Sequence, residues 1–287
     1  MTLSRRPSAV LGWGARALAG AGVPCAVADA RLLLCHTLDV EPGALVGAPD
    51  LDGDQVATYR RLVARRREGE PAQYLTGRAW FRHEELAVGP GVFIPRPETE
   101  LVAQAAVDEA RQVVSRRGSA VVVDLCTGSG AIALAVAHEV PEATVHAVEL
   151  DPVACDWARR NLSGTGVVVH HGDACSLEVV PAGSCDVVVT NPPYLRSVDA
   201  PRLDPGVVGR EPAMALFAGP EGLDVIEPLV RHAEGLLADG GLMVVEHDES
   251  HQDQVMALFG AQWTQVRGHD DLAGRPRHVT ARRRVRQ

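Results

Sequence analysis

The sequence lacks the residue patterns that hold metal ions in proteins. None of its six cysteines forms a C-x-x-C pair, which excludes a zinc knuckle and a thioredoxin-like redox motif. It contains no H-E-x-x-H run, and although His247 and His251 are four residues apart, no third ligand accompanies them. We therefore expect both histidines to be ordinary surface residues, and we predict no metal site.

Positive charge is also scarce. The sequence has no lysine, and its 28 arginines face 37 acidic residues, for a net charge of −9. The excess of acidic residues lies in residues 76–287, which contain 19 arginines and 29 acids, whereas residues 1–75 contain 9 arginines and 8 acids. Proteins whose main partner is a phosphate backbone usually carry a basic face. The composition therefore argues against sequence-specific binding of nucleic acid, and any basic patch is local.

Two arginine clusters stand out against this background. The first is a stripe at helical spacing, formed by Arg60, Arg61, Arg65, Arg66 and Arg67. Such a stripe is usually a solvated helix face, and the alternative, contact with an acidic partner or with ribosomal RNA, stays open. The second runs from Arg282 to Arg286 at the C-terminus and is expected to be frayed and solvated.

The composition is not that of a membrane-spanning protein. Apolar residues make up 46% and charged residues 23% of the sequence, which is typical of a globular protein with a buried core. Arg5 and Arg6 precede an apolar stretch in the manner of a twin-arginine export signal, but Arg16 interrupts it. We predict a short amphipathic helix there, and a cytoplasmic protein with reduced thiols.

The length of 287 residues suggests two domains. Residues 1–75 predict a small helical bundle, because apolar residues recur at intervals of three and four between breaks at Pro24, Pro42 and Pro49. Residues 76–97 mix aromatic and β-branched residues with glycine and proline, which predicts a hairpin linker. Residues 98–287 alternate helices and strands, which predicts an α/β domain whose parallel sheet has helices on both faces. The expected strands are residues 121–125, 144–150, 167–171, 186–190, 242–247, 262–266 and 278–281.

A glycine-rich loop, D-L-C-T-G-S-G, follows the first of these strands and opens a helix. Gly128 and Gly130 allow a tight turn close to a ligand, and the helix N-terminus offers free N–H groups. Together with Cys126, Thr127 and Ser129 they form the candidate cofactor loop. The same run fits the dinucleotide fingerprint G-x-G-x-x-A, so a NAD-linked oxidoreductase is a rival at this point.

Three acidic residues favour S-adenosylmethionine over a dinucleotide. Asp124 stands just before the loop, where a carboxylate suits a cationic sulfonium and amino-acid group but would repel a pyrophosphate. Glu149 ends the second strand and can accept hydrogen bonds from both ribose hydroxyls, and Asp173 ends the third, where it can accept one from the adenine amine. Open α/β sheets bind ligands at this edge. We therefore predict a site for S-adenosylmethionine.

The fourth strand runs into the motif N-P-P-Y, residues 191–194. Pro192 and Pro193 fix the backbone and lack N–H donors, so the Asn191 side-chain oxygen and nearby carbonyls are left as acceptors for an NH2 group. Tyr194 would pack on the planar face of that group. The motif predicts a methyltransferase acting on a planar amine or amide, with these four residues as its catalytic residues.

The N-P-P-Y motif does not separate two substrates, because adenine N6 and a glutamine amide both present a planar NH2 group. An enzyme acting on duplex DNA needs basic surface and must extrude its target base. Residues 76–287 instead carry a charge of about −10. The charge favours a glutamine in a protein substrate, with adenine in nucleic acid as the alternative.

The sequence resembles the bacterial HemK or PrmC family, the N5-glutamine methyltransferases of class I peptide chain release factors. The resemblance spans nearly the whole chain: G-R-A-W-F at 77–81, F-I-P-R-P-E-T-E at 93–100, the glycine-rich loop, N-P-P-Y, R-E-P-A-M-A-L-F-A-G-P-E-G-L at 210–223, and E-H at 246–247. The I-P-R-P-E-T-E block discriminates this family from nucleic-acid amine methyltransferases. The resemblance implies methylation of the glutamine in the Gly-Gly-Gln loop of a release factor, in support of translation termination, by a seven-stranded class I methyltransferase fold behind a helical, substrate-docking N-terminal domain.

The resemblance also implies that the loop from Cys126 to Gly130, Glu149, Asp173 and Asn191 contact the cofactor, and that residues 191–194 hold the glutamine. The sequence departs from the family pattern in three places. Cys126 replaces the usual glycine, which costs stability if its φ is positive. Ala174 stands where an aromatic residue often follows the acid at 173, and D-E-S-H-Q replaces G-x-x-Q after His247.

Overall fold

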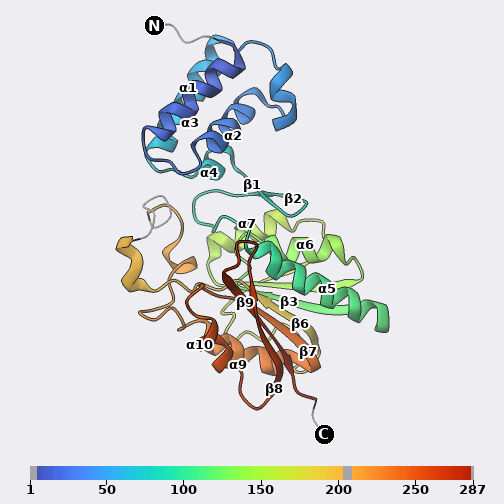
Figure 1. The fold of residues 1–287 in the computed structure, drawn as a ribbon. Coiled ribbons are helices and arrows are strands. Elements are labelled where there is room, and N and C mark those ends of the chain that lie inside the picture. Colours follow the sequence, from blue (N-terminus) through green and yellow to red (C-terminus); the bar gives the residue numbers. More distant parts are fainter. Residues whose placement is uncertain (1–4, 203–208, 286–287) are drawn as a thin grey trace. The chain divides into compact units, whose positions relative to one another are not determined.

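The computed structural model describes residues 5–202 and 209–285, which divide into two compact units. The first unit extends to Arg78 and takes in Arg210, and the second holds the other described residues from Ala79 onward. Figure 1 shows the helices and strands of both. Among the described residues, no helix is long and apolar enough to cross a membrane.

The first unit is a bundle of short helices. They are α1 (Pro7–Ala19), α2 (Ala26–Leu38), the 3-10 helix η1 (Pro42–Gly47), α3 (Gly53–Arg67) and α4 (Ala72–Thr76). Helix α3 begins at a capping box, in which Asp52 and Gln55 each accept a hydrogen bond from the backbone of the other. Tyr59 of α3 is fully buried and donates a hydrogen bond to the Ala30 carbonyl of α2 at 3.1 Å. The predicted helical bundle is confirmed.

The arginine stripe of α3 has partners inside the same unit. Arg66 Nε lies 2.7 Å from Asp29 Oδ2, and Arg65 pairs with Glu70. The guanidinium of Arg60 packs over the Trp13 ring at 5.7 Å from its centroid. These intramolecular contacts are typical of a solvated helix face.

A hairpin follows, formed by β1 (Arg78–Phe81) and β2 (Glu84–Ala87), and the rest of the second unit is one large sheet with its helices. The strands of that sheet are β3 (Ala120–Leu125), β4 (Ala143–Glu149), β5 (Val168–His171), β6 (Cys185–Thr190), β7 (Leu237–Glu246), β8 (Trp263–Asp270) and β9 (Pro276–Arg283). The helices are α5 (Thr99–Arg117), α6 (Ala131–Glu139), α7 (Pro152–Asn161), η2 (Ser197–Arg202), η3 (Ala213–Ala215), α9 (Ile226–Leu236) and α10 (Gln252–Ala257).

The sheet has the strand order β5-β4-β3-β6-β7-β9-β8, with β3 and β6 at its centre. All six residues of β6 are buried, which requires cover on both faces. Val188 packs in one hydrophobic cluster with residues of α9, while its neighbours Val187 and Val189 are buried on the opposite face. The predicted class I methyltransferase fold, an α/β sheet between helices, is confirmed (Figure 1).

The last strand corrects one expectation. β9 runs antiparallel to both β7 and β8, so the prediction of a wholly parallel sheet is wrong and the sheet is mixed. Strands β8 and β9 are joined by a short turn in which Asp271 Oδ1 accepts hydrogen bonds from the backbone of Ala273 and Arg275. Such a turn leaves no room for the crossover that a parallel connection needs.

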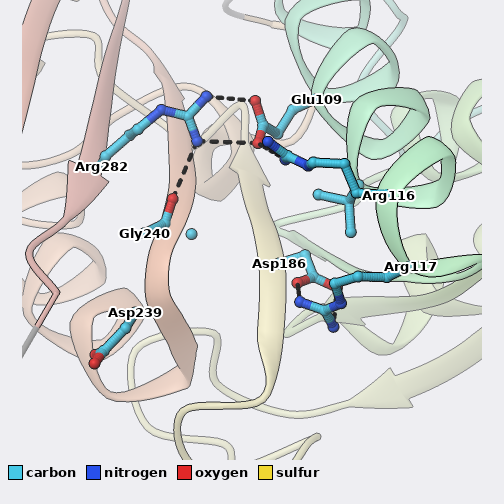
Figure 2. A pocket seen from close by; sticks show the side chains of 9 residues that line it. Glu109, Arg116, Arg117, Asp186, Asp239, Gly240 and Arg282 are labelled. Carbon is cyan, nitrogen blue, oxygen red and sulfur yellow. Dashed lines mark hydrogen bonds and ion pairs between the residues drawn. The ribbon is translucent and has the colours of Figure 1, made fainter.

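The arginine tail was also predicted wrongly in its first part. Arg282 and Arg283 belong to β9, and only Arg286 lies outside the described residues. Arg282 bonds to Glu109 of α5 at 2.9 Å and to the Gly240 carbonyl at 3.1 Å (Figure 2). With the Arg117–Asp186 pair at 2.8 Å, these residues line a cavity of about 650 Å³. The cavity lies where β6 begins, away from the ligand-binding strand ends, and its main charges are paired.

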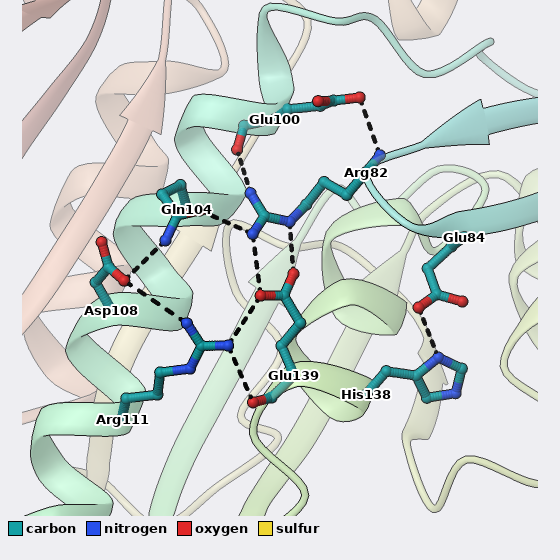
Figure 3. A network of polar contacts seen from close by, with 8 residues as sticks. All are labelled: Arg82, Glu84, Glu100, Gln104, Asp108, Arg111, His138 and Glu139. Carbon is teal, nitrogen blue, oxygen red and sulfur yellow. Dashed lines mark hydrogen bonds and ion pairs between the residues drawn. The ribbon is translucent and has the colours of Figure 1, made fainter.

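An ion-pair network ties the hairpin to α5 and α6 (Figure 3). Arg82, at the hairpin turn, places Nε 2.6 Å from Glu139 Oε1 at the end of α6. Its guanidinium also donates to the Glu100 carbonyl and to Gln104, both on α5. Arg111 adds a second contact to Glu139 at 3.0 Å. The network holds the first turn of α5, where the F-I-P-R-P-E-T-E block ends.

The loop after β3 adopts a strained backbone. Gly128 and Gly130 have φ of +58° and +86°, and a Cβ on Gly130 would lie 2.9 Å from Leu162 Cδ1. Cys126 also has a positive φ, 60°. A residue with a Cβ is less stable by about 1–2 kcal/mol in this left-handed region. The replacement of the family's glycine by Cys126 therefore lowers stability, as expected for a positive φ.

We predict that Arg82→Ala lowers the free energy of unfolding by about 2 kcal/mol, because it leaves the half-buried Glu139 carboxylate without its main partner. Arg111→Ala is the matched control, since Arg111 is 49% exposed and its loss should cost less than about 1 kcal/mol. Urea unfolding measures both. Equal decreases in the free energy of unfolding would contradict the prediction that Arg82 is the main partner of Glu139.

We predict that Cys126→Gly is more stable than Cys126→Ala by about 0.5–1 kcal/mol, because both remove the thiol but only glycine relieves the left-handed strain. Cys155, fully buried within α7, supplies the control. There the order should reverse, with alanine about 1 kcal/mol better than glycine. Thermal unfolding of the four variants checks the prediction. If the alanine variant were more stable than the glycine variant at both sites, the backbone at Cys126 would not be strained.

Candidate active site

Strand register gathers the predicted residues at one edge of the sheet. Leu125, the last residue of β3, pairs with Val148 of β4 and with Thr190 of β6. Residues 126–130, Glu149 and Asn191 follow these three paired positions directly. The structure therefore brings the cofactor loop, one of the acids and the N-P-P-Y motif together at the carboxyl ends of neighbouring parallel strands.

Asp124 is buried beneath the loop. Its Oδ2 accepts hydrogen bonds from Thr127 Oγ1 at 2.5 Å and from the Ala133 backbone at 3.2 Å. Burial raises the pKa of Asp124 to about 7, while its Oδ1 has no partner among the described residues. A buried carboxyl with one free oxygen is an acceptor that a cationic group would satisfy.

Glu149 fastens the loop to β4. Its Oε2 accepts a hydrogen bond from the Gly128 backbone at 2.8 Å, and its Oε1 accepts one from Asp151 at 2.9 Å. Burial raises the pKa of this carboxyl, against the effect of these backbone donors. Each oxygen keeps a second lone pair, so Glu149 can still accept hydrogen bonds from a ligand.

Asp173 lies at the same edge but in a different environment. His171 of β5 pairs with Glu149, and Asp173 stands two residues further on, exposed to solvent. Its Oδ1 accepts a hydrogen bond from the Cys175 backbone at 2.9 Å. Ala174, which replaces an aromatic residue of the family pattern, is buried.

Asn191 has its side chain oriented by a residue that sequence reasoning missed. Its Nδ2 donates a hydrogen bond to Thr99 Oγ1 at 3.0 Å. Because the amide nitrogen is engaged, the Asn191 Oδ1 is the part of the side chain that can accept hydrogen bonds from a substrate. Thr99 is the first residue of α5 and the threonine of the P-E-T-E run, which was the available signal.

The other end of the motif meets a buried acid. Pro192 is buried and Pro193 half-buried, and the Tyr194 hydroxyl donates to Glu246 Oε1 at 3.0 Å. Burial and the Glu246 charge raise the pKa of Tyr194 well above its usual value. Sequence reasoning assigned only packing to Tyr194, and the E-H pair at 246–247 was the signal for its partner.

A second missed acid joins two family-specific segments. Glu211, in the R-E-P-A run, accepts a hydrogen bond from the Ile94 backbone at 3.0 Å and pairs with Arg96 at 2.5 Å. The Arg96 guanidinium packs over the Phe93 ring at 4.6 Å from its centroid. Glu211 thereby fixes the F-I-P-R-P-E-T-E block, whose threonine bonds to Asn191.

The two histidines near the end of β7 were predicted wrongly. His247 and His251 are 0% and 3% exposed, so they are buried rather than surface residues. Their backbone positions explain this, since the His247 amide bonds to the Arg277 carbonyl at the end of the sheet. Burial lowers the pKa of both. Within the part of the chain that the structure describes, no group of three potential ligands could hold a metal ion.

Comparisons with family models cover both units. Residues 9–77 match the PrmC N-terminal domain, and residues 100–202 match the Methyltransferase small domain. Among solved structures, the 16S rRNA N2 G1207 methyltransferase of T. Thermophilus, in complex with AdoMet and guanosine, is similar with a TM-score of 0.50 and 22% identity over 72% of this chain and 50% of that one. At that identity the likeness shows the fold alone.

Curated relatives are similar over almost the whole length. The chain is 46% identical to the release factor glutamine methyltransferase of Streptomyces coelicolor, over 93% of this chain and 94% of that one. It is 45% identical to the enzyme of the same name from Mycolicibacterium smegmatis, over 94% and 95%. It is also 40% identical to the 4-amino-L-phenylalanine/4-methylamino-L-phenylalanine methyltransferase of Streptomyces pristinaespiralis, over 85% and 84%. With such identity along nearly its full length, the chain belongs to the release factor glutamine methyltransferase family.

Proposed function

We propose that the protein transfers the methyl group of S-adenosylmethionine to the N5 side-chain amide of the glutamine in the Gly-Gly-Gln loop of class I peptide chain release factors. The observation that carries this proposal is the 46% identity, over 93% of the chain, to a relative named for that activity. The reaction supports translation termination, which places the enzyme in the cytoplasm. The rival oxidoreductase function is set aside by the same relationship.

The residues at the strand ends fit the cofactor. Asp124 would meet the cationic amino-acid part with its unpartnered Oδ1, and Glu149 would accept hydrogen bonds from the ribose hydroxyls. Asp173, exposed at the next strand end, would accept one from the adenine amine. The loop of Cys126, Thr127, Gly128, Ser129 and Gly130 would pass close to the ligand, together with Asn191. S-adenosylmethionine supplies an electrophilic methyl group on a sulfonium.

The protein's main task at the substrate is positioning. An amide nitrogen is a poor nucleophile because its lone pair is delocalised over the carbonyl. Asn191 Oδ1 and the carbonyls beside Pro192 and Pro193 accept hydrogen bonds from the two amide hydrogens, which orients the nitrogen. Tyr194 packs against the planar amide. The nitrogen loses its proton after it has become cationic, so no general base is needed before attack.

The partner is a protein rather than a nucleic acid in this proposal. We assign residues 1–75 to docking of the release factor, residues 76–97 to a linker and residues 98–287 to methyl transfer. The excess of acids over arginines in residues 76–287 disfavours phosphate backbones as substrates.

A second candidate is methylation of a small aromatic amine. It is favoured by the relative from Streptomyces pristinaespiralis, whose name specifies an aminophenylalanine substrate. An aromatic amine, like an amide, presents a planar NH2 group to N-P-P-Y. This candidate ranks second because the identity and the covered share are lower than those of the two release factor enzymes.

The deciding experiment incubates the full chain with labelled S-adenosylmethionine and a full-length release factor, followed by mass spectrometry of the peptide that contains the Gly-Gly-Gln loop. A release factor whose loop glutamine is replaced by alanine is the control. Parallel reactions offer 4-amino-L-phenylalanine and adenine-containing DNA and RNA. Label on one of these, with none on the release factor, would overturn the proposal.

We predict that Asn191→Ala lowers turnover on the release factor by at least ~10²-fold, as removal of one oriented polar group at a reaction centre commonly does. Affinity for S-adenosylmethionine, measured by calorimetry, should change little, because the loop and Glu149 remain. Turnover within a few-fold of wild type would show that Asn191 does not hold the substrate amide.

A further inference from the structure

The two ends of N-P-P-Y are linked to a single buried carboxyl. The Tyr194 hydroxyl donates directly to Glu246 Oε1 at 3.0 Å. Asn191 Nδ2 donates to Thr99 Oγ1 at 3.0 Å, and the Thr99 hydroxyl lies close enough to Glu246 to lower the pKa of that carboxyl. Glu246 therefore accepts a hydrogen bond from Tyr194 directly, and it lies beside the hydroxyl that accepts one from Asn191.

The sheet itself places Glu246 at this point. Thr190 of β6 pairs with Val245 of β7, so Asn191 and Glu246 are the next residues on two adjacent strands. On the other side of β7, Glu246 pairs with His278 of β9, so its backbone is held between two neighbouring strands. Its side chain is 1% exposed, so water competes little for the two hydroxyls.

We infer that Glu246 is a positioning residue for methyl transfer, which orients Tyr194 and, through Thr99, Asn191. This inference rests on the proposed function. An ionised carboxylate only accepts hydrogen bonds, so in this arrangement the Thr99 hydroxyl donates its hydrogen to Glu246 and offers its lone pairs to Asn191 Nδ2. That polarity leaves Asn191 Oδ1 free for the substrate amide.

Glu246 has the acceptor capacity that this arrangement needs. Its Oε2 has no hydrogen-bond partner among the described residues, so this oxygen is open to the Thr99 hydroxyl while Oε1 accepts from Tyr194. Burial raises the pKa of Glu246 to about 7, whereas Thr99, Tyr194 and Arg277 lower it. Assays at a pH of about 8.5 therefore keep the carboxyl largely ionised.

Replacement by glutamine keeps the shape of the side chain and changes its polarity. The new NH2 group is a donor, and it can donate to Thr99 Oγ1. The Thr99 hydroxyl then turns its hydrogen toward the Asn191 amide, and Asn191 Oδ1 is occupied within the protein. An effect of Glu246→Gln on turnover thus reports on hydrogen-bond direction rather than on packing.

The test compares wild type, Glu246→Gln, and the pair Thr99→Val and Tyr194→Phe in release factor methylation. We expect Glu246→Gln to lower kcat at least about 10-fold with KM for the release factor and Kd for S-adenosylmethionine within about 3-fold of wild type. Added to the Thr99→Val and Tyr194→Phe double variant, Glu246→Gln should change kcat less than about 2-fold, because the two hydroxyls through which Glu246 acts are absent. Glu109→Gln is the matched control, since Glu109 is also a buried acid but pairs with Arg282; it should lose stability without loss of kcat.

Failure of the proposed function and failure of the role of Glu246 give different results. Absence of release factor methylation by wild type would overturn the proposed function itself. If wild type is active, a Glu246→Gln kcat within about 2-fold, or a fall in kcat matched by an equal loss of cofactor binding, would overturn the inference alone. If Glu246→Gln does not fold, the single variants Thr99→Val and Tyr194→Phe test the inference. An unchanged kcat in both would overturn it, because it would show that neither hydroxyl helps to position the N-P-P-Y motif.

Discussion

The parallel register of β3 with β4 and β6 is the constraint on which the candidate site depends. It sets Leu125, Val148 and Thr190 side by side, so that three strands end together and three functional segments begin together. The bond from the Gly128 backbone to Glu149 then fastens the loop of one strand to the end of the next. Because both contacts are made within the protein, the candidate site is formed without a ligand, which is the condition for catalysis by positioning.

The buried acids of this unit fall into two groups that differ in their partners. Glu109, Asp186 and Glu211 are each paired with an arginine. The first two join α5 to the sheet, and Glu211 joins two loops. Asp124 and Glu149 accept hydrogen bonds only from a hydroxyl or from backbone N–H groups. No arginine among the described residues forms an ion pair with either of them, and burial raises the pKa of both. Perturbed carboxyls of this kind are typical of functional sites, and a cationic ligand would relieve them.

The family-specific and the general motifs form one connected structure. N-P-P-Y is shared by amine methyltransferases with different substrates, but here its asparagine is held by Thr99 from the F-I-P-R-P-E-T-E block. That block is in turn fixed by Glu211 and, at the first turn of α5, by the Arg82 network. A segment that distinguishes the family in sequence is thus joined to the N-P-P-Y motif by a hydrogen bond, which gives a physical reason for their occurrence together.

The sequence by itself determined the helical bundle, the hairpin, the strands of the sheet and the segments that lie at its candidate ligand-binding edge. These features depend on local periodicity and on the chemistry of short motifs such as G-S-G and N-P-P-Y. The tertiary structure decided the partners of those motifs, because Thr99 and Asn191 are 92 residues apart and Tyr194 and Glu246 are 52 apart. It also decided the reversal of β9, the burial of His247 and His251, and the positive φ of Cys126. Each of these depends on which distant strand or helix lies alongside, and periodicity along one segment carries no information about that neighbour.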